Sequence, residues 1–258
     1  MVQPANPAVA LRGIGKVFES GVVALDALDL TAGSREFVSV LGPSGCGKST
    51  ALRIMAGLTP PTAGNVIWAE GAAPTRRIGF VFQEPTLMPW ASVAANVRLP
   101  LKLAGMSATD AAPAVGAALA RVGLADMAGA YPRELSGGMK MRASIARALV
   151  TRPQVLLMDE PFAALDEITR FRLNNDLLSV WQAMAGTVVF VTHSVFESVF
   201  LSSRIVVMTP RPGRVYDEIA IEEPYPRDDA FRTSAAYAGY CRRVSGILHA
   251  AMAAERVP

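Results

Sequence analysis

Cysteine, histidine and long apolar runs are scarce in this chain of 258 residues. The two cysteines, Cys46 and Cys241, lie far apart and form neither a metal-ligand spacing nor a disulfide framework. The most apolar stretch, residues 186–201, is interrupted by His193 and Glu197, so no run reaches the ~18 apolar residues of a membrane span. The start of the chain lacks a basic region followed by an apolar run, and we expect no secretory signal.

A large excess of charge of one sign is also lacking. Lys plus Arg total 25 and Asp plus Glu total 22, a formal net charge of +3, and the basic residues are scattered. This balance argues against nucleic acid as a partner. Hydrophobic residues make up 51% of the chain, enough for a substantial core. We therefore expect a soluble cytoplasmic protein.

Short β-rich runs alternate with helix-like segments, which predicts an α/β protein with a mostly parallel sheet. Residues 84–150 are alanine-rich and predict a helical insertion in a single domain. Residues 1–83 and 151–220 would form its α/β core, and 221–258 a helical tail. The expected strands lie in the first 40 residues and at 36–42, 65–69, 78–83, 154–160, 186–193, 204–209 and 214–221. The expected helices outside the insertion are 48–56, 166–184 and 229–255.

The stretch GPSGCGKST, residues 42–50, fits the pattern G-x-x-x-x-G-K-[ST] between a predicted strand and a predicted helix. Gly45 and Gly47 let the backbone N–H groups point inward, and the following helix offers its positive N-terminus to phosphate. Lys48 would contact the β- and γ-phosphates, and the Ser49 hydroxyl would bind Mg²⁺. A glycine-rich turn that binds nothing is the alternative. The expected nucleotide-binding residues of this P-loop are Gly42, Pro43, Ser44, Gly45, Cys46, Gly47, Lys48, Ser49 and Thr50.

The Cys46 thiol lies at a helix N-terminus and two residues from Lys48. Both features favour a thiolate. We expect a maleimide reagent to inactivate the protein and Mg-ATP to slow that reaction. A buried structural thiol is the alternative.

Polar residues end three further predicted strands. Asp159 and Glu160 follow a buried strand, where acids face the crevice of a parallel sheet. Asp159 would hold Mg²⁺ through water, and Glu160 would polarise the attacking water. His193 would contact the γ-phosphate, although a lone histidine is more often structural. Gln83 would complete the Mg²⁺ shell and sense the γ-phosphate.

Two glycines stand where a helix begins, in the stretch LSGGM at residues 135–139. Ser136 can cap this helix, but a cap does not require Gly137 and Gly138. Glycine costs ~1 kcal/mol relative to alanine inside a helix, so a close approach to this backbone is expected.

Six motifs stand in the order found in ATP-binding cassette ATPases, which the chain resembles from about Val9 to Val215. They are the P-loop, Gln83 in VFQEP, LSGGM, LLMDEP, the stretch ALD at 164–166, and His193. The resemblance implies a P-loop NTPase core with N-terminal antiparallel strands and an inserted helical subdomain. It further implies a homodimer that encloses two ATP molecules, each between one P-loop and the partner's Ser136, Gly137 and Gly138.

The resemblance also assigns several single positions. Asp166 would link the two sites, and Phe18 would stack on adenine unless it is a core residue. Met139 departs from the family, which usually has glutamine there. The phosphate contacts belong to neighbouring residues, so binding is not placed in doubt.

The stretches VFQEPTLMPW, NVRLPLKLAGM and MTPRPGRV resemble importers of nitrate, sulfonates, taurine and related solutes. Such a subunit is peripheral to the cytoplasmic face of the inner membrane and works with membrane permease subunits and an external solute-binding protein. A permease helix would enter a groove near Gln83, Leu87, Met88 and Trp90, unless the three apolar residues are buried in the subdomain. The solute itself is left open, because the ATPase subunit does not touch it.

The sequence leaves two other classes of protein as alternatives. A soluble cassette ATPase that remodels a cytoplasmic complex is the first alternative. DNA-repair members of that kind carry coiled-coil insertions and translation members fuse two cassettes, and this chain has neither. A small-molecule P-loop kinase is the second, and it leaves LSGGM unexplained.

Overall fold

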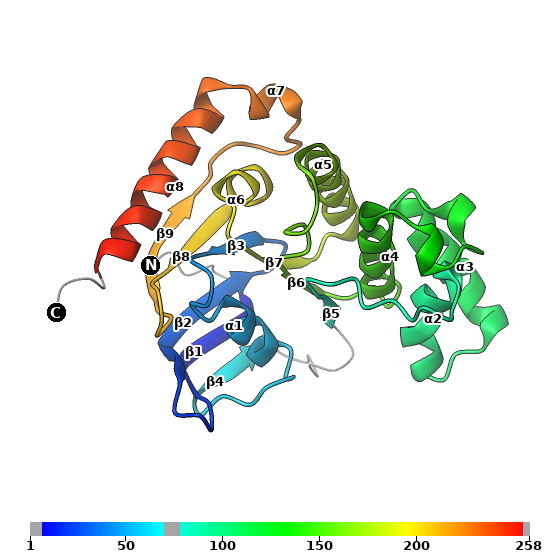
Figure 1. The fold of residues 1–258 in the computed structure, drawn as a ribbon, viewed down its shortest axis with the longest axis horizontal. Coiled ribbons are helices and arrows are strands. Elements are labelled where there is room, and N and C mark those ends of the chain that lie inside the picture. The colour runs from blue at the N-terminus through cyan, green and yellow to red at the C-terminus, as the bar shows by residue number, and fades with distance from the viewer. Residues whose placement is uncertain (1–6, 70–77, 255–258) are drawn as a thin grey trace. The chain divides into compact units, whose positions relative to one another are not determined.

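The computed structural model describes residues 7–69 and 78–254, and the chain divides into two compact units. One unit combines Met1–Thr75 with Gly186–Pro258, and the other comprises Arg76–Ala185. Figure 1 labels the helices and strands of both. Glu255, where the expected C-terminal helical segment ends, lies outside the described residues.

The first unit contains a buried parallel arrangement of strands. β3 (Phe37–Leu41) pairs in parallel with β7 (Thr187–Thr192) on one side and with β8 (Arg204–Met208) on the other. Every residue of these three strands is buried, as expected for parallel strands that are covered on both faces. β9 (Val215–Ala220) adds to β8 in the antiparallel direction.

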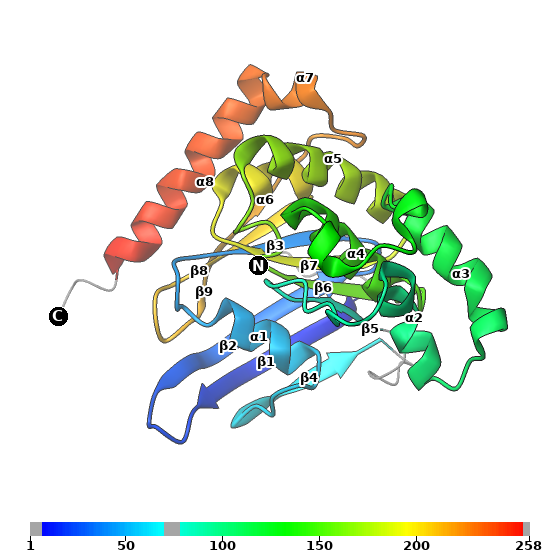
Figure 2. The ribbon, with the colours of Figure 1, turned by 45° about the vertical axis from the view of Figure 1, so that its right-hand side comes forward.

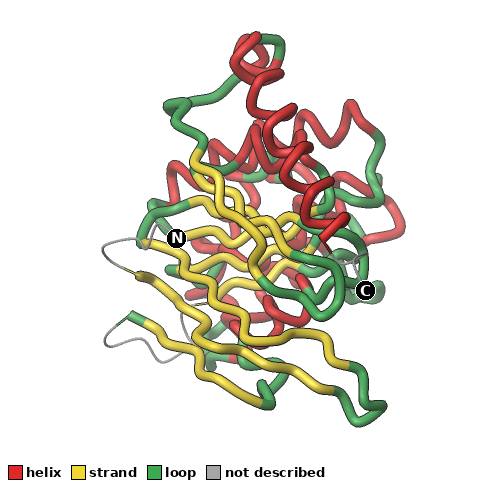
Figure 3. The backbone as a smooth tube through the Cα atoms, turned by 90° about the vertical axis from the view of Figure 1, so that its left-hand side faces the viewer, coloured by secondary structure: helices red, strands yellow, loops and turns green. Residues whose placement is uncertain are grey.

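Three further strands of the same unit form a separate antiparallel sheet in the order β2-β1-β4. They are β1 (Pro7–Val17), β2 (Val23–Gly33) and β4 (Ala63–Trp68). The strands are drawn yellow in Figure 3. The turn between β1 and β2 is closed by the Gly21 N–H, which donates to the Phe18 carbonyl at 2.8 Å. The expectation of N-terminal antiparallel strands is therefore confirmed.

The described residues of this unit also form four helices. They are α1 (Lys48–Met55), α6 (Val195–Leu201), α7 (Asp229–Arg232) and α8 (Ala235–Ala253). α6 packs against β3 and β7, and α8 packs against α6, β8 and β9. Figures 1 and 2 both show α8 beside α6.

The C-terminal tail completes the end of α6. The last carbonyl groups of a helix have no partner inside it. The buried Arg227 guanidinium donates to the carbonyls of Val199, Phe200 and Ser202 at 2.9, 3.1 and 2.9 Å. Burial lowers the pKa of Arg227. One side chain of the tail therefore caps a helix that is formed earlier in the sequence.

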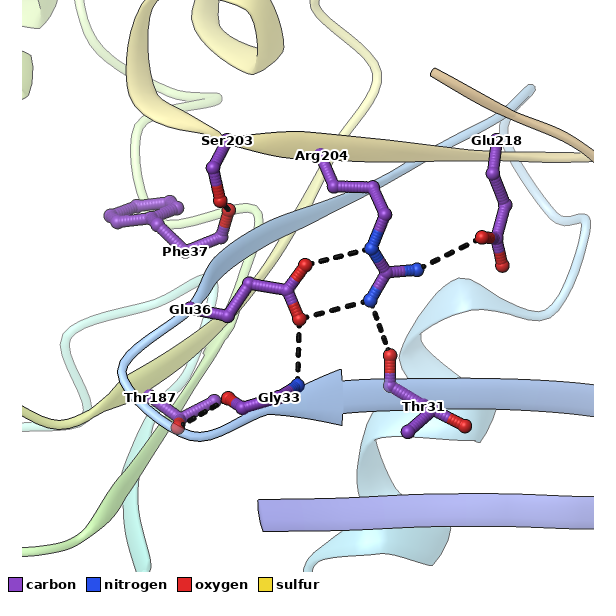
Figure 4. Close-up of polar contacts among 8 residues, drawn as sticks. All are labelled: Thr31, Gly33, Glu36, Phe37, Thr187, Ser203, Arg204 and Glu218. Carbon is purple, nitrogen blue, oxygen red and sulfur yellow. Dashed lines mark hydrogen bonds and ion pairs between the residues drawn. The ribbon is translucent and has the colours of Figure 1, made fainter. Parts of the chain in front are cut away.

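A buried ion-pair network joins the edges of the two sheets (Figure 4). The Arg204 guanidinium donates to the Glu36 carboxylate at 2.7 and 3.0 Å and to the Thr31 carbonyl, and it pairs with Glu218 at 3.2 Å. Glu36 also accepts the Gly33 N–H at 2.6 Å. Burial alone would lower the pKa of Arg204, but the hydrogen bond and charge of Glu36, with the charge of Glu218, raise it. The network fixes the start of β3, the strand that leads into the P-loop.

The described part of the second unit contains two parallel strands and four α-helices. β5 (Ile78–Val81) pairs with β6 (Val155–Asp159). The helices are α2 (Val93–Leu103), α3 (Ala108–Arg121), α4 (Gly137–Leu149) and α5 (Glu167–Met184), with 3₁₀ turns η2 (Ala125–Met127) and η3 (Pro132–Glu134). The four α-helices begin after Ser92, Ser107, Ser136 and Asp166, whose side chains each accept a backbone N–H of the first turn.

Most expected elements are present with small shifts at their ends. Gln83 was expected to end a strand, but β5 stops at Val81 and Gln83 lies in the loop beyond it. The described residues include no helix that is both long and apolar enough to cross a membrane.

Candidate functional site

The P-loop leaves the sheet at the end of β3 and turns sharply into α1. Gly42 is required because a Cβ there would lie 2.9 Å from the Cys46 sulfur. Gly45 and Gly47 have φ angles of 78° and 103°, which side chains rarely adopt. α1 begins at Lys48, so its first N–H groups, which have no partner inside the helix, face the loop. The predicted strand–loop–helix context is confirmed, and it provides an anion-binding end.

Lys48 is 4% exposed and its ammonium group turns back into the loop. It donates to the Gly42 carbonyl at 2.8 Å and to the Pro43 carbonyl at 3.0 Å. These carbonyls are weaker partners for an ammonium group than a phosphate oxygen would be. The Lys48 ammonium group therefore lies where the oxygens of an entering phosphate would replace these two carbonyls as its acceptors.

The expectation for the Cys46 thiol is wrong. Cys46 is 1% exposed, and its sulfur packs beneath Gly42. A reagent from solvent cannot reach the thiol without displacing the loop. The motif predicts a helix N-terminus at Cys46, but it does not predict whether the thiol faces solvent or the protein interior.

His193 leaves the sheet beside the P-loop. Leu41 and Thr192 are paired at the ends of β3 and β7, so Gly42 and His193 follow at the same edge. The His193 side chain is exposed there. The Thr192 hydroxyl accepts the Ser194 N–H at 3.0 Å and donates to the buried Glu197 carboxylate, which fixes the backbone on both sides of the histidine. Sequence reasoning missed Glu197, whose signal was a lone acid in an apolar stretch.

Phe18 lies in the turn between β1 and β2 and is 42% exposed. It is therefore not a core phenylalanine. The Lys16 ammonium lies 5.4 Å from the centre of its ring. An exposed aromatic face beside a cation can stack on a flat, electron-rich ring.

In the second unit, Asp159 ends β6 and is 4% exposed. Glu160 follows it with a φ of 44°, a conformation that costs a residue other than glycine of order 1–3 kcal/mol. Its side chain is half-buried. The Glu160 carbonyl accepts the Ala163 N–H at 3.2 Å, which stabilises the turn. Such strain is found most often at functional sites.

The loop after Gln83 is held by two side chains of the helices. Asn96 of α2 is fully buried. It accepts the Met88 N–H at 2.7 Å and donates to the carbonyls of Met88, Ala91 and Ser92 at 3.2, 3.0 and 3.0 Å. Arg147 of α4 donates to the carbonyls of Pro85 and Thr86 at 2.9 and 2.8 Å. Burial lowers the pKa of Arg147.

The apolar residues of this loop differ in their exposure to solvent. Gln83 is exposed, Leu87 and Met88 are half-buried, and Trp90 is 77% exposed. The alternative that all three apolar residues are buried in the subdomain is wrong for Trp90. A fixed loop that exposes tryptophan is a typical contact surface for another protein.

The signature segment starts α4 as expected. Ser136 caps the helix by accepting the Met139 N–H at 3.3 Å. Met139, which stands where the family usually has glutamine, takes part in this cap through its backbone. Gly138 is buried, and a Cβ there would lie 2.9 Å from the Thr169 methyl group of α5. The close packing against Thr169 therefore explains why position 138 is a glycine, without a contact from another molecule. Gly137 is exposed, so its backbone is accessible to another molecule.

Asp166 has a local structural role. It caps α5 by accepting the Thr169 N–H at 2.9 Å, and this hydrogen bond lowers the pKa of Asp166. The carboxylate is exposed. Its expected role between two nucleotide sites stays a prediction.

The donor set fits Mg²⁺. Ser49, Gln83 and Asp159 offer a hydroxyl, an amide carbonyl and a carboxylate, which are hard oxygen ligands. Among the described residues, no group of three or more His, Cys, Asp or Glu side chains could hold a metal ion without a ligand. Mg²⁺ commonly binds one or two protein oxygens together with substrate phosphates. Ser49 belongs to the first unit and Gln83 and Asp159 to the second, and their shared role as Mg²⁺ ligands stays a prediction.

The comparisons with known proteins agree with this P-loop architecture. The family model described as ABC transporter matches residues 25–163. The aliphatic sulfonates import ATP-binding protein of Rhodopseudomonas palustris is 44% identical over 239 residues, which cover 92% of this chain and 83% of that protein. The taurine import ATP-binding protein of Rhizobium johnstonii is 48% identical over 197 residues, 75% of each.

A solved structure extends the similarity to the fold. The dimeric post-hydrolysis state of the ATP-binding cassette MJ0796, bound to ADP and Pi, is 33% identical with a TM-score of 0.72. The match covers 84% of this chain and all of the other. The fold and the P-loop define an ATP-binding cassette. The chain belongs to the ABC transporter family and is one of its ATPases.

Proposed function

We propose that this ATPase powers the import of a small solute of the nitrate, sulfonate or taurine kind through a separate membrane permease. The observation that carries this proposal is the identity of 44–48% to ATP-binding proteins of sulfonate and taurine import. An external solute-binding protein would deliver the solute. The subunit would act at the cytoplasmic face of the membrane.

The first unit would bind the nucleotide. The P-loop N–H groups and the N-terminus of α1 would receive the phosphates, and Lys48 would exchange its carbonyl contacts for phosphate oxygens. His193, which follows β7 at the same sheet edge, would contact the γ-phosphate. Phe18 would stack on the adenine, which its exposure allows.

The second unit would supply the hydrolytic chemistry. Asp159 and Gln83 of this unit, with Ser49 of the first unit, would hold Mg²⁺, whose charge offsets that of the phosphates. The Glu160 carboxylate would orient a water molecule in line with the γ-phosphate and accept its proton. The strained backbone at Glu160 supports a functional role, because such conformations cluster at active sites.

Two copies of the chain would share each nucleotide in a head-to-tail dimer with two ATP. Ser136 and Gly137 are exposed at the start of α4, and the N–H groups of a helix N-terminus attract anions. The γ-phosphate on the P-loop of one copy would bind Ser136, Gly137 and Gly138 of the other. Asp166 would lie between the two sites. The dimeric relative with ADP and Pi supports this arrangement.

The permease would contact the loop that presents Trp90. Asn96 and Arg147 fix this loop, which follows directly after the proposed Mg²⁺ ligand Gln83. Leu87 and Met88 would line the contact with a short permease helix.

The test is solute uptake in cells that lack the gene for this chain. Wild-type protein should restore uptake of at least one radiolabelled anion among taurine, an alkanesulfonate and nitrate. Glu160→Gln should not, because it keeps the size of the side chain but removes the base. Glu222→Gln, an exposed acid outside the site, is the matched control. Normal uptake of all three anions in the deletion strain would contradict the proposal.

The dimer is tested on the purified protein. Glu160→Gln should elute as a dimer with Mg-ATP and as a monomer with ADP, because the γ-phosphate that joins the two copies is not removed. Its turnover should fall by about 10²–10⁴-fold, the usual contribution of a general base. Near-normal phosphate release would exclude Glu160 as the base.

A further inference from the structure

The turn between β8 and β9, residues 209–214, has no role in the chemistry proposed above. Its own hydrogen bonds make it rigid. The Thr209 N–H donates to the Arg214 carbonyl at 2.9 Å, and the Arg214 N–H donates to the Thr209 hydroxyl at 3.0 Å. The same hydroxyl donates to the Pro212 carbonyl at 3.1 Å. The turn can therefore serve as a fixed support for whatever packs against it.

The P-loop packs against this turn. A Cβ at Gly213 would lie 2.1 Å from the Cys46 carbonyl oxygen, so only glycine permits the approach. The Gly213 N–H donates to the Ala24 carbonyl at 2.9 Å, which anchors the turn to β2. The backbone of the turn is thus in direct contact with the backbone of the phosphate loop.

Arg211 adds a charged contact at the tip of the loop. Its Nε and one terminal nitrogen donate to the Gly45 carbonyl at 3.3 and 3.2 Å. In a trans peptide the carbonyl of one residue and the N–H of the next point in opposite directions. An anchored Gly45 carbonyl therefore directs the Cys46 N–H into the loop, where it donates to the Pro43 carbonyl at 3.3 Å.

We propose that Arg211 is a positioning residue for phosphate binding. By holding the Gly45 carbonyl outward, it keeps the Cys46 N–H directed into the loop, where a β-phosphate oxygen of a nucleoside diphosphate or triphosphate would replace the Pro43 carbonyl as acceptor. The inference rests on the proposed nucleotide role of the P-loop. Arg214 provides the matched control, because it lies in the same turn but pairs with Asp26 of β2.

The test is calorimetric titration with Mg-ADP and with a non-hydrolysable ATP analogue. Arg211→Ala should weaken both ligands by the same factor, about three- to tenfold, which is the effect of losing one ordinary hydrogen-bond contribution. Arg211→Lys should recover part of the loss, since lysine still offers an N–H donor. Arg214→Ala should bind like wild type. The melting temperature of ligand-free Arg211→Ala should match that of wild type, because Arg211 is exposed.

Three outcomes would overturn the inference. The first is wild-type affinity in Arg211→Ala. The second is a loss confined to the ATP analogue, which would make Arg211 a direct γ-phosphate contact. The third is a ligand-free melting temperature that falls enough to explain the weaker binding. Lys48→Ala separates this inference from the proposed function. If wild type fails to bind Mg-ADP, or Lys48→Ala binds it normally, the P-loop assignment itself is wrong.

Discussion

Replacing Arg204 by methionine should destabilise the protein strongly, because it leaves buried charge without compensation. The Arg204 side chain is 7% exposed, and those of Glu36 and Glu218 are 15% and 10% exposed. Methionine keeps much of the volume but removes the guanidinium donors to both carboxylates and to the Thr31 carbonyl, while Glu36 still accepts the Gly33 N–H (Figure 4).

The expected loss in the free energy of unfolding is about 3–5 kcal/mol, the usual cost of removing one partner of a buried ion pair. Domains of this size have total stabilities of about 5–15 kcal/mol, so the variant would fold with a much reduced margin. Each kcal/mol lowers the melting temperature by about 2–4 °C, which gives a decrease of about 6–20 °C.

Urea denaturation followed by circular dichroism measures this loss. Arg214→Met is the control, because the Arg214–Asp26 pair is 58% and 45% exposed and should contribute no more than about 1 kcal/mol. The reasoning is refuted if the two variants lose the same stability. A loss for Arg204→Met below about 1 kcal/mol would lead to the same conclusion.

Three further predictions concern single side chains. Maleimide should leave Cys46 unlabelled in the folded protein and label it after denaturation, as judged by mass spectrometry; rapid labelling without unfolding would contradict its burial. Gly138→Ala should lower the free energy of unfolding, measured by urea denaturation, by about 1–3 kcal/mol, because the added methyl group overpacks against Thr169. Gly246→Ala in α8 is the control and should be neutral or stabilising, because a Cβ there meets nothing within 4 Å. Burial raises the pKa of Tyr225 to about 12, so the unfolded state loses its proton first and stability should fall from about pH 10 to pH 12. Tyr225→Phe should show a shallower decline over that range, and an equal decline would show that Tyr225 does not cause it.

The sequence predicts the P-loop well because everything that shapes it is local. The glycine spacing, the strand before Gly42 and the helix from Lys48 all lie within a few residues, and each reflects a backbone requirement. The starts of α4 and α5 are also predicted well, because the capping residues Ser136 and Asp166 bond only to the first turn of the helix that each begins. Local rules therefore identify these elements to within one or two residues.

Features that depend on distant partners could not be predicted. The contact that excludes a side chain at Gly138 comes from Thr169 on another helix. The donor to the Gly45 carbonyl is Arg211, 166 positions along the chain. The sequence around Arg211 predicts a turn between two strands and carries part of the family resemblance. Nothing in the sequence tells which loop the arginine reaches, because that depends on the pairing of β3 with β8.

The pairing of β3 has a consequence for how the protein is made. The ribosome synthesises the whole P-loop motif early, but its neighbours β7 and β8 and the arginine at position 211 emerge much later. Contacts between residues so far apart in sequence form only after a large loss of chain entropy. A nascent chain that ends before β7 would carry the complete nucleotide motif and yet lack the framework that shapes it. We expect such a chain to have no measurable affinity for ADP, so nucleotide binding would begin only after β7, β8 and Arg211 have been synthesised.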